Sequence, residues 1–200
     1  DDRLAVGTSS DYAFGTGDFT IEMFVRHTSL TGQQTYFSDA QGDNNGIYFY
    51  KDGAHALSLY DNNNNVFSAG TIELNKWTHI ALSRYRGTVR GFINGTLVAN
   101  VVDSHDYTET QYNIGDSHGS SSGEFVGHIS NVRVLKGTGL YTSDFTPPTT
   151  TLTNITNTVL LCCQDSNATT AAVIPSGQSI TAAGNASATN DYNPFLYDNN

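Results

Sequence analysis

Long apolar runs and positive charge are scarce in this sequence. No stretch approaches the ~20 apolar residues that a membrane-spanning helix needs, so we expect no membrane insertion. Lys and Arg together number 9, against 19 Asp and Glu, which gives a net charge of −10. Such an acidic surface is not steered towards phosphate backbones or anionic lipids. We therefore expect neither nucleic acid nor an anionic membrane as a partner.

Cysteine and the usual helix formers are also few. The only cysteines are adjacent, Cys162 and Cys163, so a disulfide framework is excluded. Neighbouring side chains on a strand face opposite sides, and we expect this pair to pack as two small apolar residues without bonding to each other. No histidine or further cysteine lies near them, which makes a metal site improbable there. A single Met and little Lys or Glu argue against helices.

What the sequence has instead is Thr, Ser, Asn and Gly, with 11 Tyr and 10 Phe, the composition of strands and turns. Residues 76–98, KWTHIALSRYRGTVRGFINGTLV, alternate apolar and polar side chains with a period of two. Asn94-Gly95 between apolar residues predicts a tight hairpin, because a type I′ turn needs two residues that tolerate positive φ. Trp77 begins this meander, and we expect it in the core.

The remaining chain reads as about a dozen short strands, separated by turns every 8–12 residues. One of them contains a bulge near Ser130-Asn131, and Lys51-Asp52-Gly53 is the turn of another hairpin. The pattern predicts an all-β fold, an antiparallel sandwich of two sheets or jelly roll. We assign residues 1–188 to that domain and 189–200 to a C-terminal tail or linker. Because Asp1 is not an initiator residue, we expect the chain to be part of a longer protein.

Three segments in this order resemble a known family. They are FGTGDFTIEMFVR (14–26), residues 76–98, and FVGHISNVRVLKGTGLYTSDFTPPTTTL (125–152). Together they resemble the laminin-G-like, concanavalin A-like jelly roll, and most closely the modules in virion structural proteins of bacteriophages, especially marine ones. The resemblance extends from Arg3 to Gln164 and implies the jelly-roll sandwich. It leaves the function open, because this fold carries many functions.

Hydrolysis is the first function to weigh, because some relatives on this jelly roll cleave glucans. Retaining hydrolysis needs two carboxylates about 5 Å apart, which on one strand face means acids two or four residues apart. The glutamates are each isolated from a second acid at that spacing: Glu22, Glu73, Glu109 and Glu124. No nucleophile elbow or metalloprotease motif occurs either. We expect the chain not to be an enzyme.

Glycan binding is the second function, since sugar sites pair an aromatic face with planar amides and carboxylates. Several tyrosines fall on predicted strands beside loops rich in Asn and Asp. The candidate ligand-binding residues are Tyr48, Tyr50, Tyr60, Asn62, Asn63 and His118. The alternative is that the tyrosines are half-buried sheet residues and that His118 is a solvated loop residue.

Calcium is the candidate cofactor, because hard cations take oxygen ligands from carboxylates, amides and carbonyls. The candidate ligands are Asp43, Asn45, Asp61 and Asp116. Asp and Asn are also favoured in turns for their own local hydrogen bonds, and no loop of fixed ligand spacing is present. Turn chemistry is therefore the competing interpretation.

The expected function is a non-enzymatic structural or adhesion module at the surface of a virion, in a head-decoration, fibre or tail-associated protein. Its partners would be other virion proteins and host cell-surface glycans, and homo-oligomerisation is left open. Two alternatives remain: a purely structural domain that contacts neighbouring virion subunits, and a secreted laminin-G-like adhesion module of a cell.

Overall fold

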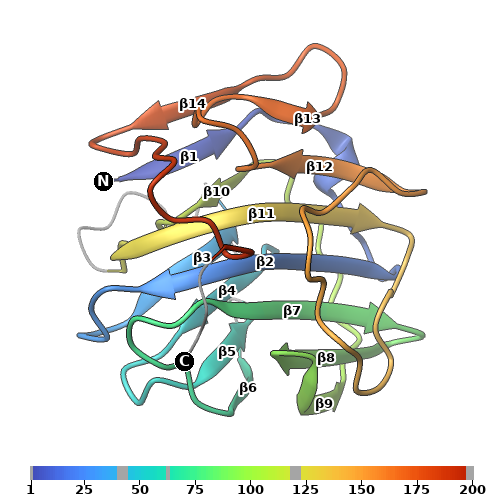
Figure 1. Cartoon of the computed structure of the whole chain (residues 1–200). Helices are drawn as coiled ribbons and strands as arrows, with labels where there is room; N and C mark the ends of the chain where they lie inside the picture. The colour runs from blue at the N-terminus through green and yellow to red at the C-terminus, as the bar shows by residue number, and fades with distance from the viewer. Residues whose placement is uncertain (1, 40–44, 62–63, 118–122, 197–200) are drawn as a thin grey trace.

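The chain folds as two antiparallel sheets packed face to face, which confirms the predicted all-β sandwich (Figure 1). The computed structural model describes residues 2–39, 45–61, 64–117 and 123–196. Sheet I contains β14 (Ile180–Ala183), β1 (Arg3–Val6), β10 (Tyr112–Ile114), β3 (Gln34–Asp39), β4 (Tyr48–Lys51), β5 (Leu57–Tyr60) and β6 (Asn65–Ala69), in this spatial order. Sheet II contains β13 (Ala171–Val173), β12 (Thr158–Cys162), β11 (Gly127–Lys136), β2 (Phe19–His27), β7 (Thr78–Tyr85), β8 (Thr88–Ile93) and β9 (Thr96–Val102).

Helix is confined to one turn in the described residues, the 3₁₀ segment Ser10–Tyr12. Within those residues, no helix has the length and apolar character needed to cross a membrane. The strands follow the period-two pattern: on β2, Ile21, Met23 and Val25 point between the sheets and are fully buried. Facing residues from sheet I, such as Phe37 and Phe49, complete the core.

The two predicted hairpins and the predicted bulge are confirmed. Asn94 and Gly95 join β8 to β9 with φ of 48° and 76°, the left-handed backbone that a type I′ turn requires. A Cβ at Gly95 would also come within 1.9 Å of the Phe145 carbonyl oxygen, so only glycine fits there. The pairing of β11 with β2 shifts register after Ser130, where Asn131 adopts a φ of 54°.

The expectation for Trp77 was wrong in one respect. Its side chain is 4% exposed, but it lies outside the cluster of residues that fills the space between the sheets. On β7, Ile80 and Leu82 point into that space, so the alternation that continues back through His79 places Trp77 on the outer face of sheet II. There it lines cavities beside residues 187–195, which explains its burial.

The expectation for the cysteines also needs correction. Cys162 ends β12 and is buried in the core, whereas Cys163 follows the strand, is half-buried and has a φ of 59°. The left-handed backbone at Cys163 breaks the strand alternation, so the two side chains do not diverge. Their Sγ atoms lie 3.6 Å apart.

The outer face of sheet II is covered by chain. Residues 138–157, here called the crossover segment, leave the end of β11, pass over β2 and β7 towards β8, and return to β12 (Figure 1). Residues 185–196, here called the tail, cross the same face over β11 and β2 (Figure 1). Ordinary backbone bonds hold the crossover segment, including one from the Phe145 N–H to the Gly95 carbonyl at 2.9 Å.

Candidate functional site

Three of the predicted ligand-binding residues come together on the outer face of sheet I. Tyr48 and Tyr50 lie two residues apart on β4, and Tyr60 on β5 is the cross-strand partner of Tyr48. The alternating residues Phe49 and Leu59 are buried in the core, so the tyrosines point away from it. We call Tyr48, Tyr50 and Tyr60 the tyrosine face.

Two of these rings are ordered against each other. The Tyr48 and Tyr50 rings stack with centroids 4.6 Å apart and an interplanar angle of 18°. The Tyr48 hydroxyl accepts a hydrogen bond from the Gln33 amide nitrogen and lies 3.1 Å from the Thr35 hydroxyl. Both ends of the Tyr48 side chain are therefore held, and the ring presents a fixed surface.

A polar network borders the other side of the tyrosine face. Tyr50 pairs across the hairpin with Ser58, whose hydroxyl donates to the Ser68 hydroxyl at 3.1 Å. Ser68, which is exposed, donates in turn to the Asp52 carboxylate. The face thus combines aromatic rings with hydroxyl groups, an amide and a carboxylate.

The charge on this border is held in place by local bonds. Burial raises the pKa of Asp52, but hydrogen bonds from Ser68 and from the Ala56 and Ala54 N–H groups outweigh it and leave that pKa below its usual value. Burial and the nearby Asp52 charge raise the pKa of Tyr50. At neutral pH the site therefore presents an ionised Asp52 carboxylate beside the neutral Tyr50 phenol.

The remaining predicted ligand residues, Asn62, Asn63 and His118, lie outside the described residues, as does the predicted calcium ligand Asp43. The polar partners Gln33, Thr35, Ser58, Ser68 and Asp52 were not predicted. Ser58 could have been found, because the predicted hairpin around Lys51-Asp52-Gly53 sets it opposite Tyr50. Gln33 and Thr35 could not, because β3 pairs with β4 across an irregular register.

The three described calcium candidates do not share one site. Asp61 follows β5 and Asp116 follows β10, with β3 and β4 between these strands, so they are roughly 14 Å apart across the sheet. Asn45 is exposed in the turn before β4. Among the described residues, no three His, Cys, Asp or Glu side chains are grouped to hold a metal ion. Calcium stays a prediction, which melting with calcium and with a chelator tests.

Asp116 is nevertheless an unusual carboxylate. It is fully buried, and no described side chain donates a hydrogen bond to its carboxylate oxygens. One of them lies 3.9 Å from Arg3 Nη1, and burial raises the Asp116 pKa. Asp61 differs, since its carboxylate accepts a bond from the Asn64 N–H at 2.7 Å and lies 3.7 Å from His105 Nδ1.

The outer face of sheet II has a buried ionic cluster of another kind. The Glu22 side chain, fully buried, accepts bonds from Arg133 Nη2 at 2.6 Å and from the Tyr141 hydroxyl at 2.8 Å. His79 Nε2 lies 3.0 Å from the second Glu22 oxygen. Arg133 also donates to the Thr153 carbonyl at 2.9 Å. Burial raises the pKa of Glu22, but the bonds and charges of His79 and Arg133 hold it below its usual value.

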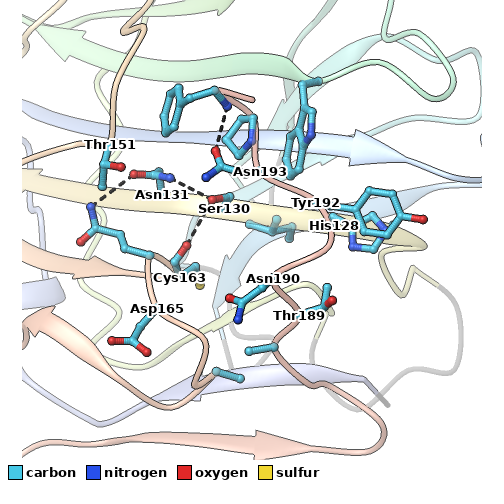
Figure 2. Close-up of a pocket in the computed structure, with 18 of the residues that line it drawn as sticks. His128, Ser130, Asn131, Thr151, Cys163, Asp165, Thr189, Asn190, Tyr192 and Asn193 are labelled. Carbon is cyan, nitrogen blue, oxygen red and sulfur yellow. Dashed lines mark hydrogen bonds between the residues drawn. The ribbon is translucent and has the colours of Figure 1, made fainter. Parts of the chain in front are cut away.

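A cavity of about 210 Å³ remains between the tail and sheet II (Figure 2). Tyr192 of the tail stacks on His128 of β11 with centroids 4.1 Å apart. The Arg26 guanidinium lies 5.1 Å from the Tyr192 ring centre. Residues that the sequence assigned to a tail or linker thus form one wall of this cavity.

Comparison with known proteins adds a family and several similar folds. The sequence profile of the concanavalin A-like lectin/glucanases superfamily matches residues 2–138. No curated protein matches the chain.

A candidate carbohydrate-binding protein from Bacteroides ovatus has a similar structure, with a TM-score of 0.66 and 15% identity, over 92% of this chain and 58% of that one. Domain 4 of an extracellular arabinanase from Geobacillus stearothermophilus, solved with arabinotriose, has a TM-score of 0.52 and 22% sequence identity over 62% of each chain. The CBM40 of a Ruminococcus gnavus sialidase, bound to α2,3-sialyllactose, has a TM-score of 0.53 and 17% sequence identity over 64% of this chain and 80% of that one. At these identities the likeness shows the fold alone.

Proposed function

Because the chain belongs to the concanavalin A-like lectin/glucanases superfamily, we propose that it is a non-enzymatic carbohydrate-binding module. The observation that carries this proposal is the tyrosine face: three tyrosines on an outer sheet face, of which Tyr48 and Tyr60 are half-buried and Tyr50 is 9% exposed, bordered by hydroxyl, amide and carboxylate groups. Aromatic rings pack against the C–H faces of sugars while polar groups bond to the hydroxyls. Both components are present on β4, β5 and their neighbours.

The ligand that fits this face is a neutral glycan. The Asp52 carboxylate and the Ser68 hydroxyl lie at its border and accept or exchange hydrogen bonds with sugar hydroxyls. The same carboxylate and the chain's net charge of −10 repel sialylated or uronic-acid sugars. The arabinanase domain and the CBM40 were each solved with a saccharide, which supports carbohydrate binding as a use of this fold.

The surroundings of Glu22 support a non-enzymatic role. It is the glutamate buried deepest in the described chain, and Arg133, His79 and Tyr141 surround its two oxygens. A retaining glycosidase needs a second carboxylate about 5 Å away and a path for the sugar between the two. Here the neighbours are a cation, an imidazole and a phenol, beneath the crossover segment.

We further propose that the module lies on the surface of a bacteriophage particle, in a head-decoration, fibre or tail-associated protein among other virion proteins. The resemblance of residues 14–26, 76–98 and 125–152 to such modules supports this placement, as does the acidic surface. Mass spectrometry of purified particles from the source tests it: the chain should be found among the virion proteins. Its absence from the particles would contradict the placement while leaving glycan binding untouched.

A structural role in assembly is the second candidate. Val102 is 83% exposed at the end of β9, one of the two edge strands of sheet II. Edge strands offer unpaired backbone groups to another chain, and an exposed valine adds apolar surface. This role would be favoured by a map of the assembled particle in which a neighbouring subunit contacts β9. A map in which β9 contacts no other subunit would argue against it.

A glycan array with neutral and sialylated saccharides tests the proposed function. The wild-type chain should bind a subset of neutral glycans, and Tyr60→Ala should lose these signals because the face loses one of its rings. Tyr192→Ala, which removes an exposed tyrosine from the tail over the other sheet, is the matched control and should bind as the wild type does. Blank arrays for the wild type, or equal binding by Tyr60→Ala, would overturn the proposal.

A further inference from the structure

Two thiols lie next to each other at the end of β12. Cys162 is 1% exposed and Cys163 is half-buried, and their Sγ atoms are 3.6 Å apart. A disulfide needs sulfur atoms about 2.05 Å apart, so the two sulfurs must approach by about 1.5 Å, through side-chain rotation and a small adjustment of the peptide between them. Most adjacent cysteines on a strand could not do this, because their side chains point to opposite faces.

The backbone conformation that brings the sulfurs together is firmly held. Cys163 has a φ of 59°, a left-handed backbone conformation that a residue with a side chain keeps only where its surroundings impose it. Its carbonyl accepts the Asn131 N–H at 2.9 Å and lies 3.3 Å from the Ser130 hydroxyl, both from the bulge of β11. Gln164, the next residue, donates to Asn131 Oδ1 at 3.2 Å. The bulge therefore fixes the chain on both sides of the Cys163 carbonyl.

The two sulfurs differ in access. Cys163 lines the cavity under the tail, together with Ser130 and Asp165 (Figure 2). Cys162 lies behind it in the core. A hydrogen bond between the two thiols, together with burial, raises the pKa of Cys162 well above its usual value. Cys163 is therefore the thiol that an incoming reagent meets first.

We propose that Cys162 and Cys163 form a reversible vicinal disulfide, which makes the end of β12 a redox-modification site. A small organic disulfide such as oxidised glutathione is the oxidant. The Cys163 thiolate attacks one glutathione sulfur, and the other leaves as a thiolate. The Cys162 sulfur then displaces the second glutathione from Cys163. Two protein thiols become one disulfide, the oxidant is reduced to two thiols, and these take up the two protons.

The disulfide acts locally rather than on global stability. Cross-linking adjacent residues closes so short a loop that the unfolded chain is hardly restrained. What changes is the cavity wall: the Cys163 thiol disappears and its side chain is fixed against Cys162. The oxidised and reduced chains should therefore melt within a few degrees of each other, while their thiol reactivity differs completely.

The experiment equilibrates the folded full chain with excess oxidised glutathione, quenches with acid, and measures the intact mass under denaturing conditions. The wild type should lose both titratable thiols, gain no glutathione and weigh two hydrogen atoms less than the reduced chain. Cys162→Ser should stop at the first step with one glutathione on Cys163. Cys163→Ser should stay unmodified, because only the buried thiol remains.

Two results for the wild type would overturn the proposal, whatever the variants do. One is retention of both free thiols under excess oxidant; the other is a lasting glutathione adduct or a disulfide-linked dimer. Because the wild-type mass decides the question, failure of either variant to fold leaves the test intact. Circular dichroism of each variant shows which of them can be used to assign the order of attack.

Discussion

The outer faces of the two sheets begin from the same strand pattern but differ in how far other segments of the chain cover them. On sheet I, the short hairpin β4–β5 carries Tyr48, Tyr50 and Tyr60 outward, where Tyr48 and Tyr60 stay half-buried and Tyr50 is 9% exposed. On sheet II, Glu22, His79 and Phe92 point outward and are buried under the crossover segment and the tail. Alternation tells which side chains leave the core, but not whether they reach solvent.

The difference shows that the role of a polar residue on an outer sheet face depends on whether other segments of the chain cover it. Glu22 is charged and lies on the outer face, yet its oxygens are bonded to Arg133 and Tyr141, so it stabilises the fold. Asp52 is also charged, but it lies beside an exposed serine at the border of the tyrosine face. We therefore propose the second carboxylate, and not the first, as a contact for the glycan.

Removing the buried carboxylate from the covered face of sheet II should cause the largest loss of stability. Glu22→Ala leaves Arg133 buried without its carboxylate, and removing one partner of a buried ion pair costs about 3–5 kcal/mol. Urea unfolding should show this loss in the free energy of unfolding. Glu73→Ala is the control, because Glu73 is exposed and pairs with Lys76 at the surface, where an ion pair contributes about 0–1 kcal/mol. Equal losses for the two variants would contradict the structural role of the cluster.

The contact between β2 and β3 at His27 should make the next largest contribution to the free energy of unfolding, and this contribution depends on pH. His27 at the end of β2 bonds to Gln34 and Tyr36 of β3, and burial lowers its pKa from 6.5 to about 4. Between these values the unfolded chain binds a proton that the native chain does not, so stability falls as pH drops from 6.5 to about 4. The shift corresponds to about 3 kcal/mol.

Unfolding experiments at several pH values check this, with His27→Gln as the comparison. Glutamine can bond to the same neighbours but does not titrate, so the variant should lack the part of the pH dependence that falls between pH 6.5 and 4. A variant curve parallel to that of the wild type throughout this range would show that His27 is not its source. Glu22 acts in a lower window: its pKa is lowered, so its contribution is lost as pH falls below the usual carboxyl range.

A substitution in the tail should cause the smallest loss of stability. Phe195 packs edge-on against Phe24 with ring centres 5.0 Å apart, and its side chain is half-buried. Phe195→Ala should lower the free energy of unfolding by about 1 kcal/mol, since only part of the ring is removed from water. Thermal unfolding checks this. A loss as large as that of Glu22→Ala would mean that the tail, rather than the crossover segment, holds the covered face closed.

Local signals in the sequence were enough for the fold. Two turns, Asn94-Gly95 and Lys51-Asp52-Gly53, and the bulge at Ser130-Asn131 each lie where their residue types predict. The three tyrosines were chosen for the loops beside their strands. That they share one face was not predicted, although alternation could have shown it, because Tyr48 and Tyr50 are two residues apart and a hairpin brings Tyr60 beside them.

What the sequence did not reveal depends on contacts between distant segments. Glu22 and Arg133 are 111 residues apart, so nothing near either residue indicates their ion pair. The same holds for Trp77, which the alternation places correctly but whose cover comes from residues 187–195. The nearness of Cys162 and Cys163 depends on one left-handed residue, which the bulge of another strand imposes.

Hydrogen–deuterium exchange, with and without a neutral glycan that binds on the array, tests the comparison of the two faces most directly. The account predicts slower exchange on binding at β4 and β5, residues 48–51 and 57–60, and unchanged exchange at residues 127–131 and 189–195. Slower exchange beneath the tail, with β4 and β5 unchanged, would contradict it and place the ligand on sheet II.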